Sequence, residues 1–103
     1  MTDMAATALD RALELSRELL EAAEAGDVAR IPSLDAQRRS LLKSVREGRR
    51  PLDQRELSVL RTIADLNALS IGKMEHRFRA KCRDLDMLAA GRRAVRAYAR
   101  TGR

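Results

Sequence analysis

Residues 53–90 read DQRELSVLRTIADLNALSIGKMEHRFRAKCRDLDMLAA, and this stretch decides the fold. Within it, one set of mostly apolar residues, here called the seam, recurs at alternating spacings of three and four. This is the heptad pattern of a long helix that packs along one side. Asp53 with Glu56 three residues later resembles a capping box and predicts the helix start. We expect the helix to continue through Gly72 and to end near Gly91. The seam residues are Leu57, Leu60, Ala64, Asn67, Ile71, Met74, Phe78, Lys81, Leu85 and Leu88.

Two shorter helices are predicted before this one, over residues 5–25 and 32–47. The first has an apolar stripe at the helical period and ends at Gly26, a typical glycine just past a helix end. The second begins near Pro32, because proline is tolerated in a first helical turn. Arg38 falls in the middle of its apolar stripe. Two interpretations of Arg38 remain: a buried stem with its charged end in solvent, or a partly buried pair with a glutamate of another helix.

The predicted fold class is all-α, with one domain over residues 1–103. Short connections make neighbouring helices antiparallel, so we expect an up-down-up three-helix bundle with a long third helix. A short C-terminal helix or arm is expected over residues 92–103. Because the chain is 45% hydrophobic but only 2% aromatic, its core must be built from aliphatic residues and methionine. Four residues expected to be buried together are Leu20, Leu42, Leu60 and Ile71.

The net charge of +6 is unevenly spread. Residues 1–27 carry two basic and seven acidic side chains, a net charge of about −5, whereas residues 73–103 carry ten basic and three acidic ones, about +7. A basic end suits an anionic partner, such as nucleic acid, an acidic protein surface or a membrane, but it also suits a solvated helix. The acidic Asp3 and the lack of an apolar run of membrane-spanning length predict a cytoplasmic protein with no membrane contact.

Few residue types suited to catalysis are present. The chain has one histidine, His76, and one cysteine, Cys82, so it forms no internal disulfide. No glycine-rich phosphate loop and no repeated metal-ligand spacing is visible. The sequence therefore predicts a protein that is not an enzyme and that holds neither a cofactor nor a metal.

Helix lengths predict a binding surface instead. At 1.5 Å per residue the third helix spans roughly 55 Å and the first roughly 30–35 Å, so the end of the third helix projects. Large apolar side chains there need cover from a client, a second copy or the C-terminal segment. For the last case we expect a regulatory lid whose apolar face is Val95 and Tyr98. The predicted client-binding groove consists of Ile71, Met74, Phe78, Cys82, Leu85 and Leu88.

Two motifs suggest a family. LSRELLEAA at residues 15–23 leads to Gly26-Asp27, and LDAQRRSLL follows at residues 34–42. An alanine-rich helix end, a Gly-Asp turn and a helix with this leucine and arginine spacing resemble the flagellar protein FliT family of export chaperones. The resemblance covers nearly the whole chain, including the Arg-rich end with its Ala97-Tyr98.

This resemblance implies a cytoplasmic chaperone for the flagellar filament-cap protein, which it delivers to the flagellar type III export apparatus. It also implies contacts with the export ATPase and export gate. Three alternatives remain: a chaperone for the hook–filament junction proteins, a homodimerisation module built on the heptad seam, and a basic helical module that binds nucleic acid. The near absence of aromatic residues counts against nucleic acid, because bases then have no stacking platform.

Overall fold

The computed structural model describes residues 4–48 and 50–101. Every element in this part of the chain is helical, so the all-α prediction is confirmed. Asp3, Arg49 of the predicted break and residues 102–103 of the predicted C-terminal segment lie outside the described residues. The elements are α1 (Met4–Ala25), a short 3-10 helix η1 (Val28–Arg30), α2 (Ile31–Glu47) and α3 (Gln54–Thr101).

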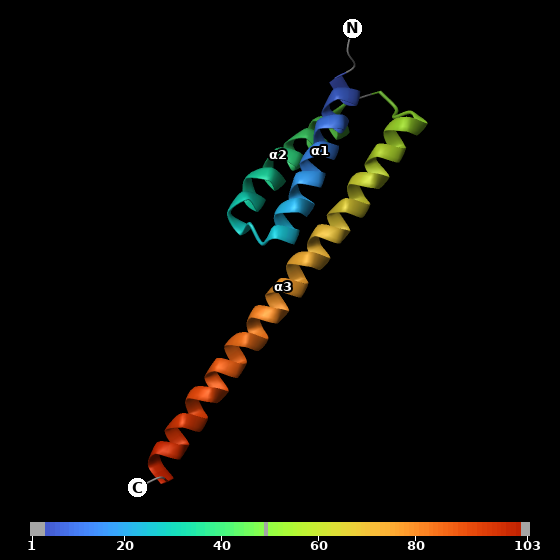
Figure 1. Ribbon diagram of the computed structural model, residues 1–103. Coiled ribbons are helices and arrows are strands. Elements are labelled where there is room, and N and C mark those ends of the chain that lie inside the picture. Colours follow the sequence, from blue (N-terminus) through green and yellow to red (C-terminus); the bar gives the residue numbers. More distant parts are fainter. Residues whose placement is uncertain (1–3, 49, 102–103) are drawn as a thin grey trace.

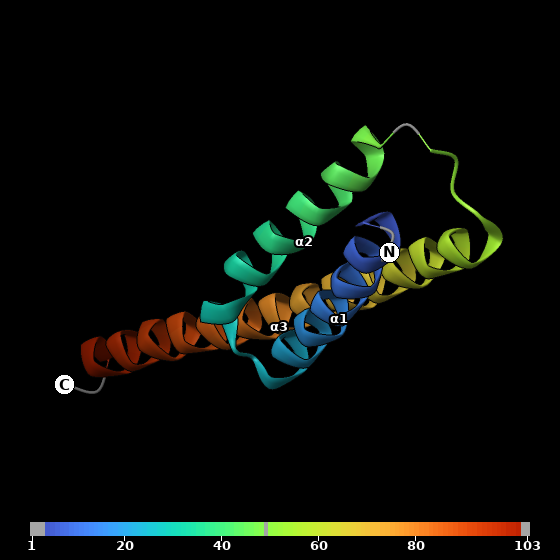
Figure 2. The same ribbon diagram turned by 90° about the horizontal axis from the view of Figure 1, so that it is seen from above.

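The helices form an elongated bundle measuring 82 × 21 × 21 Å. Figure 1 shows α1 and α3 running in the same direction with α2 reversed, and α3 extending far beyond the other two. α1 packs against both α2 and α3, whereas α2 and α3 make no close backbone contact with each other over the described residues. The view from above in Figure 2 shows the same arrangement. α1 is therefore the central helix.

Small residues allow this close packing around α1. Its buried face alternates leucines with alanines, and alanine side chains let a neighbouring backbone approach closely. Leu15 is among the most buried residues. The buried residues of α1 are Ala8, Leu9, Ala12, Leu15, Ser16, Leu19, Ala22 and Ala23.

α1 ends at Gly26, as predicted. Gly26 has a φ of +72°, a left-handed conformation that favours glycine. Its N–H donates to the Ala23 carbonyl at 3.4 Å, and the Asp27 N–H donates to the Ala22 carbonyl at 2.9 Å, which together form a Schellman motif. The Arg77 guanidinium, from α3, donates to the Glu24 carbonyl. This contact fixes the end of α1 against α3 and places a cation at the negative end of the helix dipole.

The capping box at the start of α3 is confirmed in both directions. The Glu56 N–H donates to the Asp53 carboxylate at 2.8 Å, and the Asp53 N–H donates to the Glu56 carboxylate at 3.0 Å. Arg50 adds a bidentate pair to Glu56, at 3.0 and 2.6 Å. The hydrogen bonds from Arg50 and from the Asp53 backbone lower the pKa of Glu56 from 4.5 to about 2. A buried carboxylate is thus stabilised in its charged form.

The predicted buried face of α3 is wrong in part. Ile71 is 43% exposed and Leu57 is 47% exposed, whereas Ile63, which is not one of the predicted seam residues, is buried. Leu20, Leu42 and Leu60 are only half-buried. The buried face also includes the polar residues Glu56 and Ser70, which an apolar periodicity cannot register. α3 is therefore rotated so that part of its heptad seam faces solvent.

The predicted end of α3 at Gly91 is also wrong. The helix continues to Thr101, so residues 92–101 are part of α3 and not a separate helix or arm. Glycine lowers helix stability by about 1 kcal/mol but does not prevent a helix when its neighbours favour one. The alanines and arginines around Gly91 are strong helix formers, which accounts for the continuity.

Candidate functional site: an apolar notch beside α3

A notch of about 510 Å³ lies where the turn between α1 and α2 meets α3. All three helices contribute to it, because the turn ends just where α3 begins to project. Charged residues Arg77, Lys81 and Asp84 lie at its rim. Its apolar wall is formed by Ala23, Val28, Ile31, Met74, Phe78 and Ala80.

Phe78 is the largest apolar side chain of the notch and is 71% exposed. Val28 faces the same notch and is also exposed. Large exposed apolar side chains that line one concave surface are typical of a protein-binding site. The notch can thus take apolar side chains of a partner.

The structure brings two of the predicted groove residues, Met74 and Phe78, together in this notch. Sequence analysis missed the contributions of Ala23, Val28 and Ile31. The apolar Val28 in a turn directly after Gly-Asp was the available signal, because turns seldom need such a residue.

The other predicted groove residues lie along α3. Cys82 is half-buried, while Leu85 and Leu88 are exposed on the projecting part of the helix. At 100° per residue, all of the predicted groove residues from Ile71 to Leu88 fall within an arc of about 120°. The notch is therefore the closed end of a longer apolar stripe. Nothing in the described part of the chain covers this stripe beyond the notch.

The predicted lid is not formed in this structure. Val95 and Tyr98 are exposed on the same straight helix as Phe78. Val95 lies seventeen residues beyond Phe78, roughly 25 Å along the helix axis. A straight helix cannot bring either residue back over the stripe.

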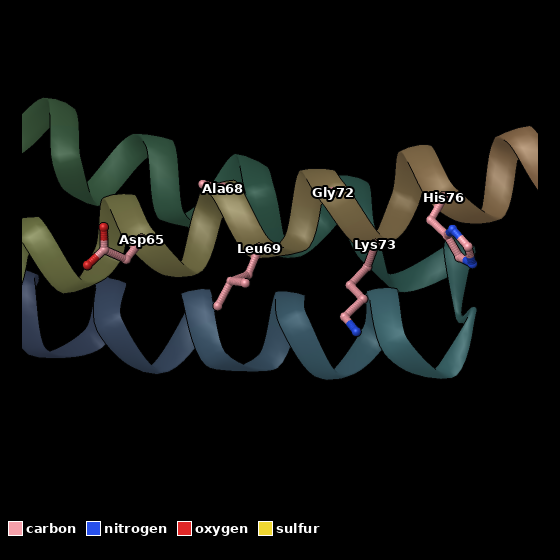
Figure 3. Close-up of a pocket in the computed structure, with 6 residues that line it drawn as sticks. All are labelled: Asp65, Ala68, Leu69, Gly72, Lys73 and His76. Atoms are coloured by element: carbon pink, nitrogen blue, oxygen red, sulfur yellow. The ribbon is translucent and has the colours of Figure 1, made fainter.

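A second, shallower depression lies on α3 and is lined by Asp65, Ala68, Leu69, Gly72, Lys73 and His76. Figure 3 shows the Leu69 and Lys73 side chains pointing toward α1. Leu69 is its one large apolar side chain and lies nine residues before Phe78, so the two point to opposite sides of the helix. Only one apolar anchor is available there, so the notch is the stronger candidate site.

The described residues offer little for metal binding or membrane insertion. No group of three histidine, cysteine, aspartate or glutamate side chains in residues 4–48 and 50–101 is placed to hold a metal ion. Within the same ranges, no helix has both the length and the apolar character needed to cross a bilayer.

Comparison with protein families decides the assignment. The model of the family described as flagellar protein FliT matches residues 6–100, which is nearly the whole chain. The chain belongs to the FliT family. FliT proteins are chaperones of flagellum biogenesis. Searches of curated proteins and of solved structures gave no match.

FliT membership gives the notch a functional context. The matched range contains α2 and almost all of α1 and α3, so it includes every residue of the notch. The motifs that suggested the family lie on α1 and α2, which form one side of the site. A chaperone needs a surface for exposed apolar segments of another protein, and the notch with its stripe is the candidate for that surface.

Proposed function

We propose that this chain is a cytoplasmic export chaperone that binds an amphipathic helix of the flagellar filament-cap protein and delivers it to the type III export apparatus. The export ATPase and the export gate are its proposed later partners. The observation that carries this proposal is the notch, in which Phe78 is exposed at the start of an uncovered apolar stripe. FliT family membership supports the flagellar context.

Phe78 is the proposed anchor of the client. An amphipathic helix binds by placing apolar residues at helical spacing into a groove, and buried aromatic side chains commonly dominate the binding energy. The stripe beyond Phe78 continues with Leu85 and Leu88, at helical spacing. A client helix of four to five turns would cover the distance from Met74 to Leu88, roughly 21 Å.

The test is calorimetric titration of the purified filament-cap protein into wild type, Phe78→Ala and Leu69→Ala. Leu69 is the matched control, because it is also apolar and exposed but lies on the opposite side of α3. We expect Phe78→Ala to weaken binding at least tenfold and Leu69→Ala to leave it within about twofold, because only an anchor residue loses more than about 1.4 kcal/mol. Equal affinities for all three proteins would place the client elsewhere.

The alternatives are examined with the same variants. Titration with the hook–filament junction proteins distinguishes the two client classes. Sedimentation at several concentrations shows whether a second copy occupies the stripe, in which case Phe78→Ala would lower the mass of the free protein. A salt titration with DNA tests the basic half of α3, since binding through phosphates weakens steeply as salt rises.

A further inference from the structure

The projecting end of α3 carries a row of arginines. Arg92, Arg96 and Arg100 follow one another at spacings of four and are exposed, and they are called the arginine row below. At this spacing they lie on one side of the helix, over roughly 12 Å of its length. Figure 1 shows this part of α3 extending beyond α1 and α2, so neither shorter helix lies beside the row.

The arginine row has no acidic partner in the part of the chain that the structure describes. Residues 87–101 contain no aspartate or glutamate. Asp86 lies six residues before Arg92, beyond the spacing of three or four at which side chains of one helix pair. No ion pair joins the row to any other described residue. Its charges are therefore balanced by solvent alone.

The stability of α3 does not account for the row. Like charges spaced by four residues repel each other and weaken an isolated helix. The helix dipole favours a cation in the last turn, which applies to Arg100 but not to Arg92 or Arg96. A row of like charges that the helix does not need points to a partner of opposite charge.

The arginine row continues the apolar stripe of the proposed client site. Each arginine of the row lies eighteen residues after a residue of the predicted client groove, which is five full turns, so the two point in the same direction roughly 27 Å apart. By contrast, Val95 and Tyr98 point about 100° and 160° away from the direction of Phe78. The pairs are Met74 with Arg92, Phe78 with Arg96, and Cys82 with Arg100.

We propose that the arginine row is the second half of the client site and binds an acidic stretch of the same client helix whose apolar residues occupy the notch and the stripe. This inference rests on the proposed function. The distance from Met74 to Arg100 is roughly 39 Å, so a client that fills both halves is a continuous helix of about seven turns. Its acidic residues recur at spacings of three or four, about eighteen residues from the residue that packs on Phe78.

The arrangement of the two halves selects this class of ligand. The ligand must present apolar side chains and negative charges on one side, in that order along its length. An amphipathic helix with an acidic end does so, whereas nucleic acid has no apolar side chain for Phe78 and a flat lipid surface does not fit a concave notch. Ion pairs across the row also fix the direction in which the client helix lies, because the reversed helix would leave its acidic residues on the stripe.

The test is titration of the purified filament-cap protein into wild type and two triple variants at low salt. The row variant replaces all three arginines of the row by glutamine, which keeps helix propensity but removes the charge. We expect it to weaken binding about tenfold, within the range of three exposed ion pairs, and the control to stay within about twofold. The control removes the same net charge from exposed arginines off the row, as Arg46→Gln, Arg61→Gln and Arg83→Gln.

Two further measurements separate recognition from general attraction. The affinity of wild type should fall as salt rises, and that of the row variant should fall less, because exposed ion pairs are screened. In a double-mutant cycle, the acidic residues of the client stretch are replaced by their amides. We expect this change to weaken binding to wild type about tenfold and to leave binding to the row variant nearly unchanged. Circular dichroism confirms that the variants are helical.

The outcomes distinguish this inference from the proposed function. If the row variant binds the client as tightly as the control variant while Phe78→Ala binds weakly, the inference is wrong and the proposed function stands. The inference is also wrong if client affinity is unchanged but the row variant loses mass in sedimentation, or loses binding to anionic vesicles or DNA. The row would then serve a second copy, a lipid surface or nucleic acid. If the client does not bind wild type, both are overturned.

Discussion

Replacing Gly26 by alanine should destabilise the protein, although alanine is the better helix former. The φ of Gly26 is +72°, and a non-glycine residue in this left-handed region costs roughly 1–2 kcal/mol. The added methyl carbon would also lie 2.6 Å from Nη1 of Arg77, which must move away from the Glu24 carbonyl. Alanine restricts the unfolded chain, which offsets about 0.4–1 kcal/mol. We expect a net loss of about 1–2 kcal/mol.

Gly72→Ala is the matched control with the opposite sign. Gly72 lies inside α3 and a methyl group added there would meet no atom within 4 Å. The helix then gains the propensity difference between glycine and alanine, about 0.8–1 kcal/mol. The same chemical change should therefore produce a difference of about 2–3 kcal/mol between the two variants.

The assay is urea denaturation followed by circular dichroism for wild type and both variants. A difference of about 2–3 kcal/mol separates the midpoints by roughly 1 M or more for a protein of this size. If Gly26→Ala raised the midpoint as much as Gly72→Ala, neither the left-handed turn nor the Arg77 contact would constrain the end of α1. The turn between α1 and α2 would then not be held rigidly at the side of the notch.

Further predictions concern the core, the capping box and the projecting helix. Leu15→Ala should lower stability by about 2–5 kcal/mol in urea denaturation, while the exposed Leu57→Ala should stay within about 0.5 kcal/mol; similar losses would show that Leu57 is buried. Because the pKa of Glu56 in the folded protein is about 2, the stability that its charged carboxylate adds to the fold is fully present above pH 4.5 and is lost as the pH falls toward 2. Urea midpoints measured between pH 4.5 and 2 should fall less for Glu56→Gln than for wild type. The same fall of the midpoint with pH in both proteins would contradict this. By mass spectrometry, amides of residues 85–101 should exchange faster than those of residues 59–74, because this exposed part of α3 extends beyond α1 and α2 in the described structure; uniform protection would mean that something covers it.

Local signals in the sequence were sufficient for the end of α1 and the start of α3, but not for the end of α3, which passes Gly91. The Gly26 turn and the box formed by Asp53 and Glu56 are interactions between residues close in sequence, so their residue types alone predict them. The buried face of α3 was not predictable in the same way. A strict seven-residue repeat drifts by about 20° per repeat on a straight helix, so the residues from Leu57 to Phe78 do not all face one partner. Ser70 is buried because α1 is central, which depends on packing and not on hydrophobicity.

The candidate site was predictable on one helix only. Met74 and Phe78 follow from the apolar spacing of α3 and from the relative helix lengths. Val28 and Ile31 join them because the turn between α1 and α2 lies beside Met74 and Phe78 of α3. This placement depends on how the helices align in three dimensions, which apolar spacing along one helix does not predict. Arg38 was recognised as unusual in an apolar stripe, and both sequence interpretations were incomplete: it is buried, and it pairs with Asp35 of its own helix.

The continuous α3 bears on the lid expected from Val95 and Tyr98. A lid requires a break, and Gly91 is the weakest point of the projecting half, by about 1 kcal/mol relative to alanine. The straight helix leaves the stripe from Phe78 to Leu88 exposed, so the proposed client site is accessible in this conformation. A folded-back tail would lower the apparent affinity only in proportion to the fraction of molecules that it closes. Since residues 92–101 continue α3 away from the bundle, a client that binds this conformation does not have to displace them, and Arg92, Arg93, Arg96 and Arg100 stay exposed for an acidic partner.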